Sequence, residues 1–165
     1  MPRQLENLFH HQKSQYCMPT IYTDIEINAP RDQVWMALVR KEDWAEWNTF
    51  LFDRDPRKRF QQGRSLMLSL KRISREKETE FRAKIVNMQP CLYLQWVSTA
   101  PGYMSEHRFE LQDIGLNRTQ YRHHERISGV LSPLFLPFIR QDEHNGMRRM
   151  ASDLKQYVEW VSRQT

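Results

Sequence analysis

The segment FIRQDEHNGMRRMASDLKQYVEWV, residues 138–161, carries the longest uninterrupted helical pattern in the chain. Its apolar residues recur at spacings of three and four, which places them on one face of an α-helix. At about 1.5 Å per residue this helix is roughly 35 Å long, and its apolar face requires a partner surface. Pro137 suits the first turn, and Gly146 is either an accidental weakness or a point of close approach. The apolar face consists of Met147, Met150, Ala151, Leu154, Tyr157, Val158 and Val161.

The partner surface is predicted by alternating apolar and polar residues ahead of the helix. Leu66, Leu68 and Leu70, for example, alternate with more polar residues, which is typical of a half-buried strand. No connection is long enough for a crossover helix, so we expect neighbouring strands to pair antiparallel in chain order. Six strands are predicted here, at residues 49–53, 65–73, 79–88, 92–98, 104–112 and 119–128.

The first part of the chain adds one strand and two helices. Residues 21–27 alternate as a strand, and a helix that opens at Pro30 buries Val34, Trp35 and Leu38. A short helix is predicted at residues 42–47. The order strand, two helices, six strands, long helix predicts an α+β fold in which a strongly bent seven-stranded antiparallel sheet wraps around the C-terminal helix.

Length and composition indicate one domain. The 165 residues are 39% hydrophobic, enough for a single core over residues 21–163. Residues 1–20 are expected to be a flexible extension, although Leu5, Leu8 and Phe9 leave a short docking helix open. Cys17 and Cys91 lie far apart, which argues against a disulfide framework or a zinc site. With no apolar run of membrane-spanning length, we expect a cytoplasmic protein without stable membrane insertion.

The charge balance bears on the kind of partner. The net charge of +5 is mild, and the basic clusters at residues 54–64 and 71–77 contain acidic residues as well. Aromatic residues that would stack on bases are missing around them. We therefore expect a small molecule rather than nucleic acid as the partner. The oligomeric state stays open.

Two stretches resemble a known superfamily. INAPRDQVWMALVRKEDWAEWNTF, residues 27–50, resembles the opening of the START-like, or SRPBCC, helix-grip proteins, with its "AP..VW..L" helix and "W..WN" turn. HRFEL (residues 107–111), Thr119 and HHERISG (residues 123–129) resemble the polyketide cyclase/dehydrase-like branch. The resemblance covers about residues 21–162. It implies a helix-grip fold whose sheet and long helix enclose a cavity for lipids, polyketides or other hydrophobic molecules, but no subfamily motif assigns a catalytic residue.

The last predicted hairpin gathers the candidate polar site. With its turn at residues 113–117, one side of both strands carries Phe109, Leu111 and Tyr121, so this side is predicted to face inward. His107, His123 and Glu125 share that parity and are expected to point inward too. The predicted register pairs Leu111 with Thr119, Phe109 with Tyr121 and His107 with His123.

Several roles fit two imidazoles and a carboxylate on an apolar face. They could form a satisfied structural network, an anchor for a ligand's polar group, an acid–base pair, or part of a metal site. Trp96 is expected in the cavity wall, and the two helix methionines as core or as an adaptable lining. The candidate ligand-binding residues are His107, His123, Glu125, Trp96, Tyr121, Phe109, Met147 and Met150.

Two functions compete. The absence of GxSxG, P-loop, GxGxxG and HExxH motifs favours a non-catalytic protein that binds or carries a hydrophobic small molecule, with no cofactor and no metal. The alternative is a cyclase- or dehydratase-type enzyme that uses His107, His123 and Glu125 as acid and base. A protein-interaction module built on Leu5, Leu8 and Phe9 is a third possibility with less support.

Overall fold

A computed structural model describes residues 20–164. Residues 1–19 of the expected extension lie outside this range, and Thr20 is the first residue of a strand. In chain order the elements are β1 (Thr20–Ile27), α1 (Arg31–Val39), a 3-10 turn (Lys41–Asp43), α2 (Trp44–Trp47), β2 (Leu51–Asp53), β3 (Ser65–Leu70), β4 (Thr79–Gln89), β5 (Tyr93–Ala100), β6 (Tyr103–Gly115), β7 (Arg118–Ser128) and α3 (Ser132–Ser162).

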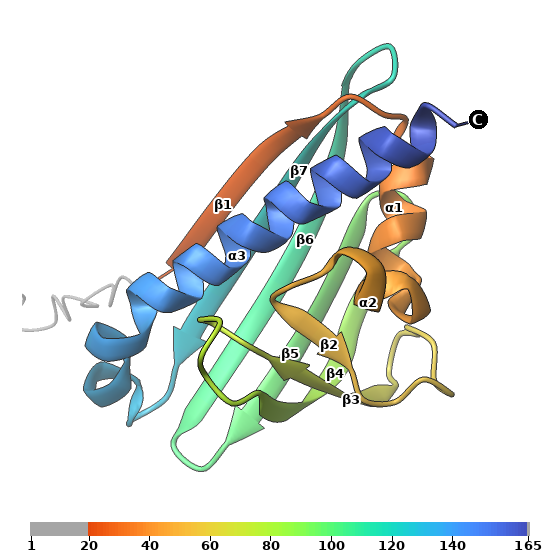
Figure 1. The fold of residues 1–165 in the computed structure, drawn as a ribbon. Helices are drawn as coiled ribbons and strands as arrows, with labels where there is room; N and C mark the ends of the chain where they lie inside the picture. Colours follow the sequence, from red (N-terminus) through yellow and green to blue (C-terminus); the bar gives the residue numbers. More distant parts are fainter. Residues whose placement is uncertain (1–19, 165) are drawn as a thin grey trace, which may run out of the picture.

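The strands form one antiparallel sheet in the order β1-β7-β6-β5-β4-β3-β2. Strands β2 to β7 therefore pair in chain order, and β1 closes the sequence by pairing with β7. The sheet is curled, α3 lies along its inner face, and α1 and α2 cover one end (Figure 1). The predicted α+β architecture, a bent seven-stranded sheet wrapped around a long C-terminal helix, is confirmed.

Helix α3 begins earlier than predicted, at Ser132 rather than near residue 138. Pro133 occupies its first turn, where a missing N–H costs nothing, and Pro137 lies inside the helix. The added turns expose Leu134 and Phe135, at 62% and 45%, and only Leu136 among their apolar residues joins the buried stripe. The sequence pattern missed them for that reason.

Gly146 marks a close approach between α3 and the segment before β2. A Cβ at this position would lie 2.4 Å from Cδ2 of the buried Phe50 ring. No side chain fits there without displacing Phe50. Of the two interpretations of this glycine, the close approach is the one that the structure supports.

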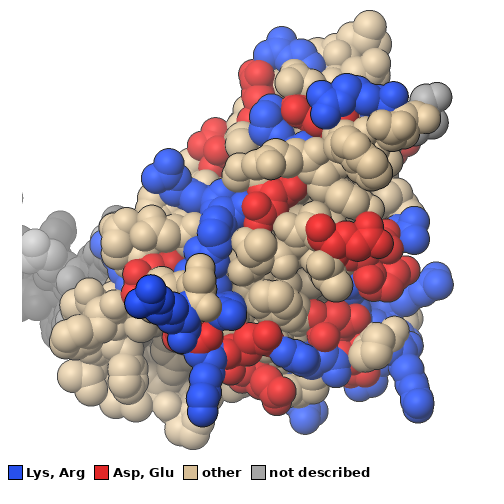
Figure 2. Space-filling model, viewed as in Figure 1, with Lys and Arg blue, Asp and Glu red and all other residues tan. Residues whose placement is uncertain are grey.

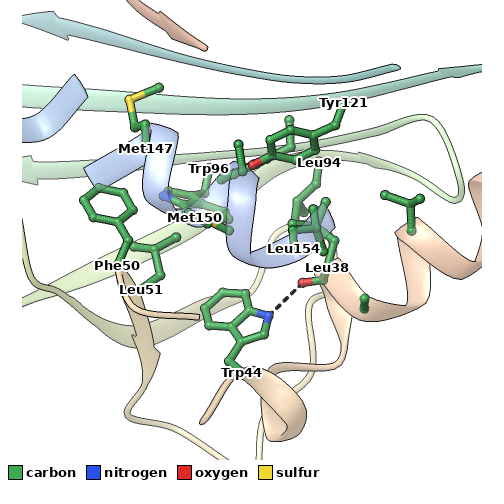
Figure 3. Packing of buried hydrophobic residues seen from close by; sticks show 14 of the residues in the cluster. Leu38, Trp44, Phe50, Leu51, Leu94, Trp96, Tyr121, Met147, Met150 and Leu154 are labelled. Atoms are coloured by element: carbon green, nitrogen blue, oxygen red, sulfur yellow. Dashed lines mark hydrogen bonds between the residues drawn. The ribbon is translucent and has the colours of Figure 1, made fainter. Parts of the chain in front are cut away.

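Trp44 and Asn48 of the W..WN motif form hydrogen bonds with backbone groups. Trp44 Nε1 donates a hydrogen bond to the carbonyl oxygen of Leu38 at 3.1 Å (Figure 3). Asn48 Oδ1 accepts from the backbone N–H groups of Phe50 and Leu51, at 3.0 and 2.9 Å. These bonds join α1, α2 and β2. The residues of the motif therefore stabilise the fold, and nothing in these contacts points to a chemical role.

The register of the last hairpin differs from the prediction by two residues. His107 pairs with Glu125, Phe109 with His123 and Leu111 with Tyr121. The five-residue turn was wrong, because β6 continues to Gly115 through a register shift and the turn itself contains Asn117 at a φ of 51°. A shift of two preserves side-chain parity, so the same residues still face inward.

The outer surface mixes both signs of charge. On the face that carries α3, Lys and Arg side chains are interspersed with Asp and Glu (Figure 2). Within residues 20–164, no helix is long and apolar enough to cross a membrane.

Candidate functional site

All eight candidate residues lie between the sheet and α3. Each is 2% exposed or less. Figure 3 shows Trp96 and Tyr121 on the sheet side, with Met147 and Met150 on α3. The sheet contributes Trp96 from β5, His107 and Phe109 from β6, and Tyr121, His123 and Glu125 from β7.

An aromatic cluster runs across β5, β6 and β7. The rings of Phe109 and His123 stack with centroids 4.0 Å apart, and Trp96 lies 4.7 Å from Phe109 and 5.5 Å from His107. Phe60, from the loop between β2 and β3, stacks on the other side of Trp96 at 5.8 Å. The predicted inward orientation of these rings is what brings them together.

A chain of polar contacts crosses the same face. Ser105 Oγ donates to Glu125 Oε1 at 2.7 Å, and His107 Nε2 lies 3.4 Å from that oxygen. The other nitrogen of this ring, His107 Nδ1, lies 3.0 Å from His123 Nε2. The two imidazoles and the carboxylate that the sequence placed on one side therefore form a single chain.

Glu143 of α3 extends this chain to an arginine. Its carboxyl group is 1% exposed and accepts a hydrogen bond from Arg72 Nε at 2.6 Å. Burial raises the pKa of Glu125 to about 7, and burial together with the charge of Glu125 raises the pKa of Glu143 to about 7. Arg72 also forms an ion pair with the partly exposed Glu76, at 3.2 Å. Because Glu125 and Glu143 influence one another, their two carboxyl groups titrate as a unit.

The histidines are neutral near pH 7. Burial lowers the pKa of His107 to about 4. It also lowers the pKa of His123 well below its ordinary value, helped by the neighbouring charge of His107. Neutral imidazole has one donor and one acceptor nitrogen, so each ring can relay a hydrogen bond.

Several buried polar atoms on this face have no hydrogen-bond partner among residues 20–164. They are Trp96 Nε1, Tyr121 OH, His123 Nδ1, Glu125 Oε2 and Glu143 Oε1. A proton shared by the two glutamates satisfies the last two, and three remain. Each unpaired buried group costs about 1–3 kcal/mol, and most folded proteins contain few of them.

The open hollows of the molecule lie elsewhere. One of about 430 Å³ is lined by residues that include Met36, Val39, Phe60 and Met88, between α1 and the end of β4. Another, of about 440 Å³, lies between β1 and α3. None of the eight candidate residues lines either hollow. The eight side chains are closed off from solvent instead.

Metal binding was one of the possibilities for the imidazoles and the carboxylate. In the described part of the chain, no group of three or more His, Cys, Asp or Glu side chains is arranged to hold a metal ion.

Sequence reasoning missed three members of the polar chain. Ser105 has the same strand parity as His107, so extending the alternation by two residues would have found it. Glu143 precedes Met147 and Met150 by four and seven residues, and a carboxyl group on an apolar helix face is itself a signal. Arg72 follows β3 in an irregular segment, and nothing local points to it.

Similarity to known proteins is found among solved structures. No family model matches the chain, and no curated protein matches it. A START superfamily protein from Mycobacterium smegmatis superposes with a TM-score of 0.67 at 15% identity, over 86% of this chain and 98% of that one. A Thalictrum norcoclaurine synthase mutant, in complex with a transition-state analogue, superposes at 0.65 and 12% identity, over 90% and 97%.

A third similar structure is BexL, a di-domain ARO/CYC protein from a biosynthetic pathway. It superposes with a TM-score of 0.65 at 14% identity over 88% of this chain, which spans 48% of BexL. At these identities the similarity concerns the fold. The chain has the helix-grip fold of the START-like, or SRPBCC, proteins, as the two motifs implied.

Proposed function

We propose that this protein binds a hydrophobic small molecule, of lipid, polyketide or aromatic character, between the sheet and α3. The observation that carries the proposal is the set of unpartnered atoms Trp96 Nε1, Tyr121 OH and His123 Nδ1 on an otherwise apolar inner face. A face evolved for packing alone would have apolar residues there, since each unpaired group costs stability. A ligand with a polar group would give these atoms partners.

The packed interior requires a way in, and Phe60 offers one. Its ring lines the 430 Å³ hollow on one side and stacks on Trp96 on the other. Rotating this ring away would connect the hollow to the aromatic cluster. Met147 and Met150 can then adapt, because the thioether side chain is flexible and polarisable.

The cellular setting and the partner follow from composition. A mild net charge with both signs interspersed favours a small molecule over nucleic acid, and few cysteines suit a reducing cytoplasm. Both are part of the proposal.

The test is a titration with phenylnaphthylamine, a neutral probe whose fluorescence rises in apolar surroundings, on protein labelled at its methionine methyl groups. We expect saturable binding, with NMR shifts of the Met147 and Met150 methyl groups and none for Met104, which is 39% exposed. The variant Phe60→Ala should speed association, whereas Phe138→Ala, an equal truncation at an exposed site, should not. No saturable binding, or shifts confined to exposed methionines, would contradict the proposal.

A second candidate is an acid–base enzyme of the cyclase or dehydratase kind. What favours it is the pKa of about 7 for Glu125 and Glu143 beside two neutral imidazoles, because groups that titrate near working pH make efficient acids and bases. Faster dehydration of a β-hydroxy ketone by the protein than by buffer, lost in Glu143→Gln, would establish it.

A further inference from the structure

The chain of polar contacts from the two glutamates to His123 orders its donors and acceptors. Glu125 Oε2 and Glu143 Oε1 both lack a donor among residues 20–164 when the groups are carboxylates, and the charge of Glu125 raises the pKa of Glu143. One proton between these oxygens gives both a partner, whichever group carries it. In either case the other oxygen of Glu125, Oε1, remains an acceptor for Ser105 Oγ and His107 Nε2.

The histidine tautomers follow from this acceptor. His107 must carry its proton on Nε2, because an unprotonated nitrogen 3.4 Å from Glu125 Oε1 would set two lone pairs against each other. In the neutral ring Nδ1 then holds a lone pair, so His123 Nε2, 3.0 Å away, is the donor. His123 is neutral as well, and its Nδ1 is left as a buried acceptor without a donor among residues 20–164.

Resting on the proposed binding of a hydrophobic molecule, we propose that the interior site selects ligands with a hydroxyl group, an alcohol or a phenol, which donates its hydrogen bond to His123 Nδ1. Ser105, Glu125 and His107 are positioning residues, because they fix the tautomer of His123 through the chain. The ring of Tyr121 lies edge-on to His123 with centroids 6.5 Å apart, and its unpartnered hydroxyl is a donor for the ligand's oxygen.

The charges around the chain disfavour an anionic head group. Arg72 is already paired with both Glu143 and Glu76, so a carboxylate ligand would bring a buried negative charge without a counter-ion. A ketone or an ether would place an acceptor against the acceptor His123 Nδ1. A hydroxyl group is neutral and has the hydrogen that the site lacks.

The experiment compares a naphthol with its methyl ether, which share the ring system but differ in the donor hydrogen. Both should displace phenylnaphthylamine, and the naphthol should bind at least tenfold more tightly, since only it pairs His123 Nδ1. Equal affinities would overturn the selectivity while leaving the proposed binding function intact. If phenylnaphthylamine binds saturably but neither the naphthol nor its ether displaces it, the proposed selectivity is overturned. If phenylnaphthylamine itself does not bind, the proposed binding function is overturned as well.

Two further measurements keep the test decisive. His123→Leu should reduce the naphthol preference to about one, and the control His124→Leu, on the outward-facing neighbour, should retain it. Nitrogen-15 NMR of the ligand-free protein should show both His107 and His123 protonated at Nε2 and not at Nδ1. A proton on His123 Nδ1 would overturn the inference without any ligand, even if the leucine variant does not fold.

Discussion

Two ends of the interior differ in how they are held together. The acidic end consists of Arg72, Glu143, Glu125, Ser105 and His107, whose polar groups form hydrogen bonds and ion pairs. The apolar end consists of Leu38, Trp44, Leu154 and Val158, where α1 and α2 pack against the second half of α3 (Figure 3).

The two ends also differ in the kinds of groups that they bury. At the apolar end the one indole nitrogen is paired with a backbone carbonyl, and the remaining contacts are dispersion and burial. At the acidic end and along the neighbouring aromatic cluster, charged groups are desolvated and polar atoms lack partners, both of which oppose folding. Trp47 Nε1 and Asn48 Nδ2, near the apolar end, also lack a partner among residues 20–164, so what sets the acidic end apart is its buried ionisable groups.

The largest expected effect is a cavity at the apolar end. Leu154→Ala should lower the free energy of unfolding by about 2–5 kcal/mol, because Leu154 is fully buried and its neighbours cannot collapse completely. The control Leu134→Ala, on the same helix but 62% exposed, should change it by under about 0.5 kcal/mol. Urea unfolding measures both. Equal effects would show that the apolar end is not the part that holds the fold together.

The next effect concerns pH at the acidic end. The pKa values of Glu125 and Glu143 are about 7 in the folded chain, above the ordinary 4.5, so the folded state holds extra protons and loses stability as pH rises from about 4.5 through 7. The lowered pKa values of His107 and His123 act oppositely, and their effect ends about one pH unit above the ordinary 6.5. Between pH 6.5 and 7.5 the histidines therefore offset part of the carboxyl effect, and wild type should lose under about 1 kcal/mol.

Replacing one carboxyl group should remove part of this dependence. In Glu143→Gln the carboxyl part shrinks while the histidine part stays, so the change in unfolding free energy from pH 6.5 to 7.5 should be more positive than in wild type by at least about 0.5 kcal/mol. Asp142→Asn, the neighbouring position on α3, should keep the wild-type dependence. If Glu143→Gln also keeps it, the two glutamates do not share a proton.

The smallest effect has an unusual sign. Tyr121→Phe should raise the free energy of unfolding of the ligand-free protein by about 1 kcal/mol, because it removes a buried hydroxyl that has no partner among residues 20–164. Tyr93→Phe is the matched control, since its hydroxyl donates to Gln95 Oε1 at 2.7 Å, and it should lower stability by about 1 kcal/mol. Thermal unfolding measures both variants, and stability changes of opposite sign would confirm that the two hydroxyl groups differ. A loss of stability in Tyr121→Phe would show that the Tyr121 hydroxyl has a hydrogen-bond partner.

Much of the architecture could be predicted because its signals are local. Alternation along β6 and β7 identified the inward faces of Phe109 and His123, and helical spacing identified Met147 and Met150. Errors fell where the local signal is weak. A bulge and a tight turn at Asn117 shifted the hairpin register, and exposed turns at the start of α3 hid the true beginning of the helix.

By itself, the sequence determined the order of the elements and which side chains face inward, because both depend on periodicities of two and about 3.6 residues within single segments. Only the tertiary structure decided which inward groups meet. Arg72 and Glu143 are 71 positions apart and form an ion pair because the curled sheet brings the end of β3 against α3. The proposed sharing of a proton by Glu125 and Glu143 depends on that long-range contact, which no local pattern encodes.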